Sequence, residues 1–199
     1  MHRDEDARRR LTRIPPQGAV VAVLAIAGLC SSFMFTLVVP IQASLPELLH
    51  ASREDTAWVV TVTLLVAAVI TPISGRLGDM YGKRRVVLAL LALLVVGSVI
   101  AATSTGIIPL IVGRGLQGAV TGVVPLGISI LRDILHEDRV DAAIALISAT
   151  LGVGGALGMP LSALVTQYAD WHGLFWMSAG LGAVVFGLVL WIVPVSVLR

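Results

Sequence analysis

Apolar residues fill six long stretches of the chain, and short polar segments separate them. The apolar stretches run from Gly18 to Val39, Ala57 to Ile73, Val86 to Ala102, Ile107 to Leu131, Val140 to Val165 and Leu174 to Val193. An apolar helix of about 17 residues or more can cross the hydrocarbon core of a bilayer. The pattern therefore predicts six transmembrane helices.

The polar connections predict how these helices follow one another. The connection at 40–56 is the longest, and Ser52-Arg-Glu-Asp55 resembles a capping box that begins the second span. The connection at 103–106 is so tight that spans three and four must be antiparallel neighbours. The connections at 132–139 and 166–173 are short polar turns. Three hairpins of similar length suggest a 3+3 internal repeat.

Composition supports an all-α membrane protein. Hydrophobic residues make up 57% of the chain and charged residues only 13%, with a mean hydropathy of +0.95, whereas a soluble domain carries about 25% charge. Cys30, the single cysteine, lies in an apolar run, which excludes a disulfide framework and a CxxC metal site. No nucleophile, base or metal-ligand set lies at membrane depth, so we expect neither an enzyme, a cofactor nor a metal.

The basic residues predict the orientation of the spans. With the N-terminus in the cytoplasm, every Lys and Arg lies on the cytoplasmic side except Arg53, which lies outside, and Arg114, which lies within a span. We therefore expect both termini in the cytoplasm of a multi-pass protein of the plasma membrane, or bacterial inner membrane. Residues 1–17 form a cytoplasmic tail and residues 18–199 the six-helix bundle. Because the bases lie beside apolar runs, they indicate topology rather than nucleic-acid binding.

The densest charge falls between the second and third spans, in GRLGDMYGKRR at 75–85, here called the gating segment. Its glycines allow two helix ends to approach and turn. The carboxylate of Asp79 can sit at the positive end of another helix, and the bases can pair with nearby acids. We expect a reversible latch in this cytoplasmic turn; the alternative is a solvated loop whose bases only set topology.

The gating segment closely resembles the loop between helices two and three of the major facilitator superfamily. The matching positions are Gly75, Leu77, Asp79, Gly82, Lys83, Arg84 and Arg85, whereas Gly78 and Met80 depart from the family pattern. The resemblance implies that Asp79 latches onto a helix of a second six-helix half and helps to close the cytoplasmic side. It also implies that Lys83 pairs with an acid at the end of span four, for which Asp133 is the candidate.

A second resemblance lies in span four, where Gly113-Arg-Gly-Leu-Gln-Gly118 is similar to a motif of the same superfamily. Arg114, Gln117 and Thr121 share one helix face. A buried arginine costs roughly 2.5–3.5 kcal/mol on insertion scales, so we expect this face to line a substrate passage. The alternative is that Arg114 lies close enough to the outer interface to reach it.

Span five contains Gly152-Val-Gly-Gly-Ala-Leu-Gly-Met-Pro160. Gly154 and Gly158 form a GxxxG face suited to close helix packing, and Pro160 would bend the helix. The stretch loosely resembles the antiporter motif of the superfamily. Together with Thr56-Ala-Trp58 and Trp171-His-Gly-Leu-Phe175, it is similar to the fourteen-span drug:proton antiporter branch.

The resemblance implies a secondary transporter that exports a small amphipathic or cationic compound by alternating access, with proton coupling. The sequence departs from this pattern because all twelve acids lie in tails, connections or span ends. Expected partners are the lipid bilayer, a small-molecule substrate, protons and a second six-helix half, either a missing C-terminal half or a homodimer mate. The alternative is a non-transporting protein that acts as partner or regulatory subunit of a larger carrier.

Overall fold

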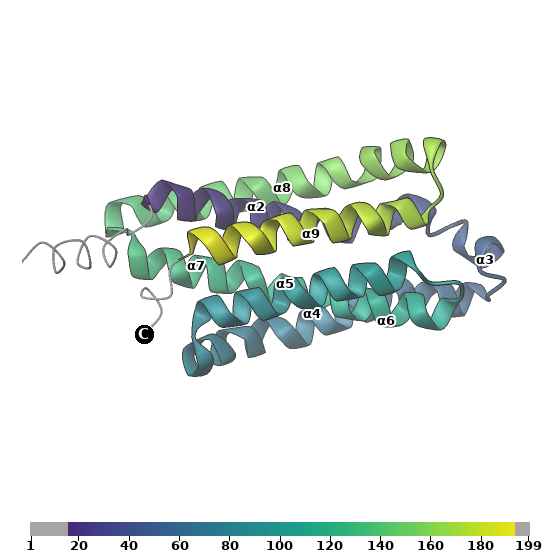
Figure 1. Ribbon diagram of the computed structural model, residues 1–199, viewed down its shortest axis with the longest axis horizontal. Helices are drawn as coiled ribbons and strands as arrows, with labels where there is room; N and C mark the ends of the chain where they lie inside the picture. The colour runs from purple at the N-terminus through teal and green to yellow at the C-terminus, as the bar shows by residue number, and fades with distance from the viewer. Residues whose placement is uncertain (1–15, 194–199) are drawn as a thin grey trace, which may run out of the picture.

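The computed structural model describes residues 16–193, which form long helices lying side by side along one axis (Figure 1). The elements, in chain order, are α2 (Gln17–Thr36), η1 (Val39–Ile41), α3 (Leu45–Leu48), α4 (Arg53–Tyr81), α5 (Lys83–Ala102), α6 (Ile107–Gly118), η2 (Ala119–Gly122), α7 (Val123–Ile134), α8 (Glu137–Tyr168) and α9 (His172–Ile192). Of the predicted tail, only Pro16 and Gln17 lie within the described residues, and Gln17 already belongs to α2.

Within residues 16–193, six helical segments are long and apolar enough to cross a membrane. They run over Gln17–Ile41, Arg53–Tyr81, Lys83–Ala102, Ile107–Ile134, Glu137–Tyr168 and His172–Ile192. These segments confirm the six predicted spans and the all-helical fold class. The fourth span consists of α6, η2 and α7 in succession.

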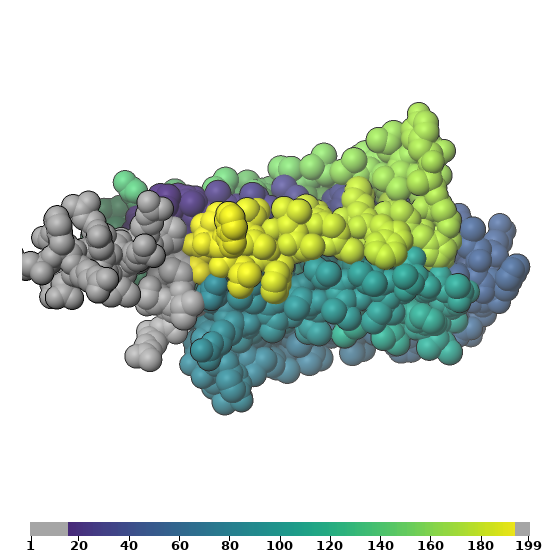
Figure 2. Space-filling model, viewed as in Figure 1, coloured from purple at the N-terminus to yellow at the C-terminus, as the bar shows by residue number. Residues whose placement is uncertain are grey.

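The helices pack around a continuous apolar core. α2 lies along α8, and α5 lies along both α6 and α9; the space-filling view shows these elements closing into one elongated body (Figure 2). Leu24, Leu91, Leu126 and Val185 are among the core side chains, one each from α2, α5, α7 and α9. α4 and α8 bury the smallest shares of their residues, so their outer faces are free to contact lipid or another bundle.

The two ends of the bundle differ in the connections they carry (Figure 1). One end, here called the α3 end, holds α3, the α5–α6 connection and the α8–α9 connection. The opposite end, here called the gating end, holds the α4–α5 and α7–α8 connections. At the α3 end, the Ser52 hydroxyl accepts a hydrogen bond from the Asp55 backbone N–H at 3.0 Å and so caps α4, as the sequence predicts.

The gating segment is helical for most of its length, which corrects its prediction as a loop. α4 continues through Gly75 and Asp79 to Tyr81, and α5 begins at Lys83. The reversal is confined to Gly82, whose φ of 94° and ψ of 127° lie where a side chain would be strained. One glycine therefore replaces the expected loop.

Span four is not a uniform α helix. A 3₁₀ stretch at Ala119–Gly122 separates α6 from α7 and comes just before Pro125. Proline lacks an N–H and its ring crowds the carbonyl four residues earlier, here that of Thr121. A 3₁₀ helix turns about 20° more per residue than an α helix, so the residues after Gly118 are rotated away from the face that a straight helix would give them.

Candidate functional site

At the gating end, the structure brings together Lys83 and Asp133. The Lys83 ammonium group donates to a carboxylate oxygen of Asp133, joining the start of α5 to the last turn of α7. A cation at a helix N-terminus and an anion at a helix C-terminus are each unfavourable alone. The attraction between Lys83 and Asp133 offsets both of these unfavourable charge–dipole interactions. It also ties the α4–α5 turn to the end of span four.

Two glycines make this turn possible. Gly82 supplies the backbone reversal, and Gly78 faces α7 so closely that an added Cβ would overlap the Leu126 side chain. Gly75, in contrast, has open space where its Cβ would be. Within residues 16–193, the close approach is made at Gly78, which sequence reasoning noted only as a departure from the family pattern, and the role of Gly75 stays a prediction.

The other charged residues of the gating segment divide between inward and outward positions. Arg84 donates through Nη2 to the carbonyl oxygen of Leu190 at 2.8 Å, in the last turn of α9, where a cation is favourable. Asp79 is exposed, and within residues 16–193 it makes neither a hydrogen bond nor an ion pair. Its carboxylate is thus available to a group outside the described residues.

Arg114 is the largest fully buried side chain of the described structure, with 1% of its surface exposed. Its Nη1 donates to the Met34 carbonyl oxygen at 3.1 Å and to Gln117 Oε1 at 2.8 Å, and its Nε donates to the Val59 carbonyl oxygen at 3.4 Å. Met34 lies in the last turn of α2, where carbonyl oxygens lack intrahelical partners and the helix dipole is negative. The guanidinium therefore caps α2, and no acidic side chain among residues 16–193 pairs with it.

The hydrogen bonds extend from Arg114 across four helices. Gln117 Nε2 donates to the Ser98 hydroxyl of α5 at 2.8 Å, and the Thr63 hydroxyl of α4 donates to the Arg114 carbonyl oxygen at 3.2 Å. We call Arg114, Gln117, Ser98 and Thr63 the arginine network. Sequence reasoning found its first two members; Ser98 and Thr63 carry no signal beyond being polar residues in apolar runs.

The arginine network bears on both expectations for Arg114, and its passage role stays a prediction. The side chain does not reach the outer interface, and neither it nor Gln117 lines an open passage in this structure. Of the three predicted passage residues, Thr121 borders a cavity of about 340 Å³. Thr121 itself lies within the 3₁₀ stretch η2, so it is rotated relative to the helix face that Arg114 and Gln117 share.

This cavity lies beside α2, η2, α7 and α8. Hydroxyl groups and apolar side chains share its wall, which consists of Ser31, Ser32, Phe35, Thr36, Thr121, Val124 and Leu151. Such a mixed, uncharged lining suits an amphipathic molecule. Sequence reasoning missed most of these residues because they come from separate helices and follow no common motif.

The glycines of α8 lie against α2. A Cβ at Gly154 would overlap the Leu29 carbonyl oxygen, and one at Gly158 would overlap the Thr36 hydroxyl. Pro160 lies inside α8, which continues through it as one helix to Tyr168. The GxxxG pair thus brings α2 and α8 close together beside the cavity.

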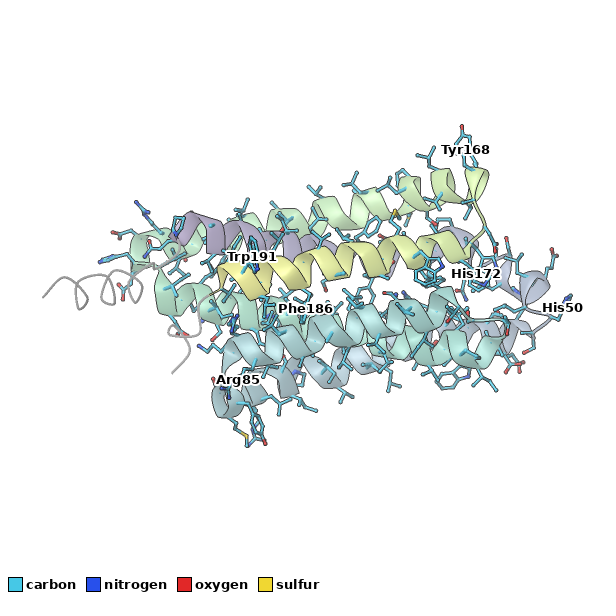
Figure 3. All side chains as sticks on the ribbon, in the orientation of Figure 1. His50, Arg85, Tyr168, His172, Phe186 and Trp191 are labelled. Carbon is cyan, nitrogen blue, oxygen red and sulfur yellow. The ribbon has the colours of Figure 1, made fainter. Side chains whose placement is uncertain are left out.

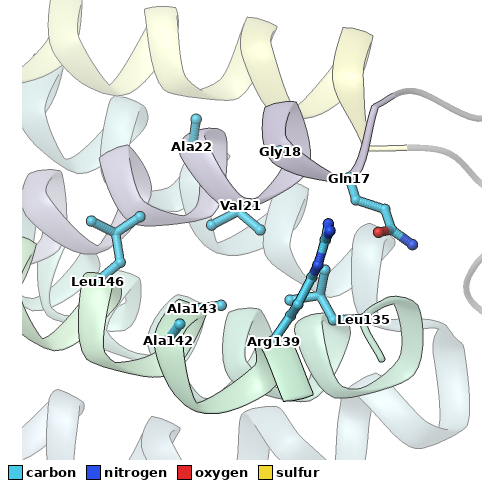
Figure 4. A pocket seen from close by; sticks show the side chains of 9 residues that line it. All are labelled: Gln17, Gly18, Val21, Ala22, Leu135, Arg139, Ala142, Ala143 and Leu146. Carbon is cyan, nitrogen blue, oxygen red and sulfur yellow. The ribbon is translucent and has the colours of Figure 1, made fainter. Parts of the chain in front are cut away.

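A second groove opens between α2 and α8 at the gating end (Figure 4). It has a volume of about 320 Å³ and is lined mainly by apolar side chains, among them Val21 and Leu146, with Arg139 beside Leu135. At the same place, Gln17 Nε2 donates to the Ile134 carbonyl oxygen at 2.9 Å and ties the start of α2 to the end of α7.

Comparison with known proteins places this geometry in context. Residues 24–198 match the family model described as Major Facilitator Superfamily. The uncharacterized MFS-type transporter YvkA of Bacillus subtilis is 31% identical over 163 residues, which cover 80% of this chain and 36% of that protein. The tetracenomycin C resistance and export protein of Streptomyces glaucescens is 30% identical over 158 residues, which cover 78% of this chain and 29% of that protein.

Solved structures show the same fold. The crystal structure of a D-xylose-proton symporter superposes with a TM-score of 0.76 at 14% identity, covering 89% of this chain and 50% of that one. The chain therefore spans half of that structure and about a third of the length of these curated relatives.

Proposed function

Because the chain belongs to the Major Facilitator Superfamily, we propose that it acts as a secondary active transporter, together with a second six-helix half. The proposed activity is export of a small amphipathic or cationic compound by alternating access. In such transporters one bundle rocks against the other around a site between them. The second half is either a further segment of a longer protein or a second copy of this chain.

The observation that carries this proposal is the arrangement of the gating end. Lys83 is bound to Asp133 and Arg84 to the end of α9, so the α4–α5 turn is held rigidly on its own bundle. Asp79 points out of the same turn without a partner among the described residues, on α4, one of the two helices with the most exposed faces. A rigid turn that presents one exposed carboxylate suits reversible docking onto the positive end of a helix in another bundle.

Different observations support the proposal of export and the proposal of proton coupling. Export is favoured by the tetracenomycin relative, by the resemblance to the drug:proton antiporter branch, and by the uncharged cavity beside Thr121. Proton coupling needs a titratable group that changes its exposure during transport. The acids of the described residues lie at the two ends of the bundle, and a second copy of this chain would carry the same arrangement. We therefore propose proton coupling only for a second half that is a further segment of a longer protein and contributes a titratable group at membrane depth.

We propose that the protein lies in the plasma membrane, a bacterial inner membrane, and the charge distribution supports placing the gating end in the cytoplasm. Within the described residues, the gating end carries Arg76, Lys83, Arg84, Arg85, Arg132 and Arg139, whereas the α3 end carries Arg53. Positive residues remain on the cytoplasmic side during insertion. Both termini would then be cytoplasmic, because an even number of spans returns the chain to the side on which it began.

Flux into and out of liposomes tests the proposal. The chain, reconstituted in liposomes together with its second half, should move a lipophilic cationic dye when a proton gradient is applied. Asp79→Asn should slow the flux without reducing insertion, since it removes the docking charge and leaves the fold intact. Asp141→Asn is the matched control, because Asp141 is also an exposed acid near the gating end. Equal flux from native protein and Asp79→Asn would exclude the docking role of Asp79.

The same preparation separates the transporter from the alternative role. If the native chain gives no flux and instead binds another membrane protein tightly, the half-size partner or regulatory subunit is the better description. Flux from a chain shown to be monomeric would contradict the need for a second half.

A further inference from the structure

His172 joins two connections at the α3 end of the bundle. It is the first residue of α9 and lies between the α8–α9 and α5–α6 connections (Figure 3). Its Nδ1 lies 2.5 Å from Asp170 Oδ2, and its Nε2 lies 2.7 Å from the carbonyl oxygen of Ser104. Both ring nitrogens are therefore at hydrogen-bond distance from protein oxygens.

The chemistry of these partners determines the protonation state of the ring. A backbone carbonyl oxygen can only accept a hydrogen bond. Asp170 Oδ1 accepts the Trp171 backbone N–H at 2.7 Å, and an ionised carboxylate can only accept through its second oxygen as well. A neutral imidazole carries one N–H and would set a nitrogen lone pair against one of the two oxygens. Both hydrogen bonds form together only when the ring carries two protons and a positive charge.

An aromatic ring lies against His172. The ring centroids of Trp171 and His172 are 3.7 Å apart with the planes inclined by 30°, and Trp171 in turn packs edge-on against Phe175 at 5.9 Å. A cation over an indole face is attracted by the negative charge of the ring system. The N-terminus of α9 acts against a cation, and the Asp170 carboxylate offsets it at hydrogen-bond distance.

Asp170 is the one charged group paired with His172 at the α3 end among the described residues. The α5–α6 connection presents only the uncharged Ser104 carbonyl to the ring, and α8 ends at the exposed Tyr168. The remaining titratable residues of the α3 end make no hydrogen bond or ion pair with His172 within residues 16–193: Glu47, His50, Arg53, Glu54 and Asp55. Asp170 is the one charged partner that the described structure gives to His172.

We propose that His172 is a proton-binding site and that the bound proton fastens the α5–α6 connection to the α8–α9 connection. Asp170 is two residues away on the same connection, so its bond to His172 is local. The bond to Ser104 crosses 68 positions of the chain and joins two hairpins. Loss of the proton leaves one acceptor without a donor and releases the contact between the hairpins. This proposal does not depend on the substrate or the direction of transport.

Spin-label distances across the contact test the proposal. Thr105→Cys and Tyr168→Cys place labels at exposed positions on the two connections, and Cys30→Ala removes the native thiol. In liposomes with equal pH on both sides, the distance distribution should be narrow at about pH 5 and broader at about pH 8, because a histidine ring that carries two protons loses one as the pH rises. An unchanged distribution would overturn the proposal.

Two replacements of His172 assign the pH effect. His172→Arg keeps donors toward both oxygens at every pH, so its distribution should stay narrow at about pH 5 and about pH 8. His172→Gln has a single amide NH₂ group, which cannot donate to Asp170 and to the Ser104 carbonyl oxygen at the same time. Its distance distribution should therefore stay broad at both pH values. A pH-dependent change that persists in His172→Arg, or a narrow distribution in His172→Gln at the lower pH, would refute the role of His172.

Discussion

At the scale of single residues, Arg114 shows how a charge can be buried in this bundle without an acid beside it. Its donors end on the carbonyl oxygens of Met34 and Val59 and on the Gln117 side chain. The Met34 carbonyl belongs to the negative end of α2, so part of the compensation comes from the helix dipole. The arginine is thus a structural tie among α2, α4 and α6 in this conformation.

A double-mutant cycle tests that tie. Arg114→Met should lower the free energy of unfolding by about 1–3 kcal/mol because it leaves buried acceptors without donors. Gln117→Leu should lower the free energy of unfolding by a similar amount. The loss in the double variant should be smaller than the sum of the two single losses, because each single change leaves the other side chain without its hydrogen-bond partner. The measurement is denaturant unfolding in detergent micelles. Arg76→Met, at an exposed position, is the control; additive losses would argue against direct coupling.

Gly82 is the residue on which the α4–α5 turn depends. Gly82→Ala forces a Cβ into a backbone conformation that costs about 1–3 kcal/mol for other residues, so it should lower the melting temperature and also the flux. Gly75→Ala should leave the melting temperature close to native, because its Cβ meets nothing within 4 Å. Thermal unfolding in micelles measures both. Equal melting temperatures would mean that the turn relaxes easily.

At the scale of helices, the hydrophobic pattern was sufficient to find the number, order and approximate place of the spans. It placed the start of span four at Ile107 and the end of span three at Ala102, both as observed. It ended span two at Ile73, whereas α4 continues to Tyr81. Charged residues mark where a helix leaves the hydrocarbon; they do not mark where it stops, because a helix in water remains helical until a residue such as Gly82 reverses it.

The direction in which each side chain points from its helix was harder to predict than the positions of the spans. A helical wheel puts Arg114, Gln117 and Thr121 on one face, but it assumes a constant turn per residue. The 3₁₀ stretch η2 breaks that assumption before Pro125. Moreover, a polar side chain facing a carbonyl group on another helix gives the same sequence signal as one facing a water-filled passage. Only the positions of α2 and α4 show whether a polar side chain bonds to another helix or lines a passage.

Helix packing leads to a prediction for α2 and α8. Gly154→Ala places a Cβ against the Leu29 carbonyl oxygen, so the two helices must move apart. We expect a loss of about 1–3 kcal/mol, typical of overpacking. Gly152→Ala, on the same helix, meets nothing within 4 Å and should have little effect or a small stabilising one. Thermal unfolding of the two variants in micelles compares them; a smaller loss for Gly154→Ala than for Gly152→Ala would contradict the observed contact.

At the scale of the whole molecule, the two ends of the bundle differ in both charge and construction. The gating end gathers most of the basic residues and holds its turns with Lys83–Asp133 and Arg84–Leu190. The α3 end carries few bases and is joined through His172. If the chain transports by alternating access, as we propose, its two ends must open at different times. Contacts of different chemistry at the two ends would then allow each end to respond to a different signal.

The charge asymmetry also predicts which end faces the cytoplasm. In a Cys30→Ala background, a cysteine at Thr105 should react with a membrane-impermeant maleimide added to intact cells, because the α3 end should lie outside. A cysteine at Asp141, near the gating end, should react only after the membrane is permeabilised. Both positions are exposed, so a difference in labelling reports sidedness rather than burial. The reverse pattern would place the gating end outside and would remove the cytoplasmic latch proposed for Asp79, while leaving the contacts of His172 unaffected.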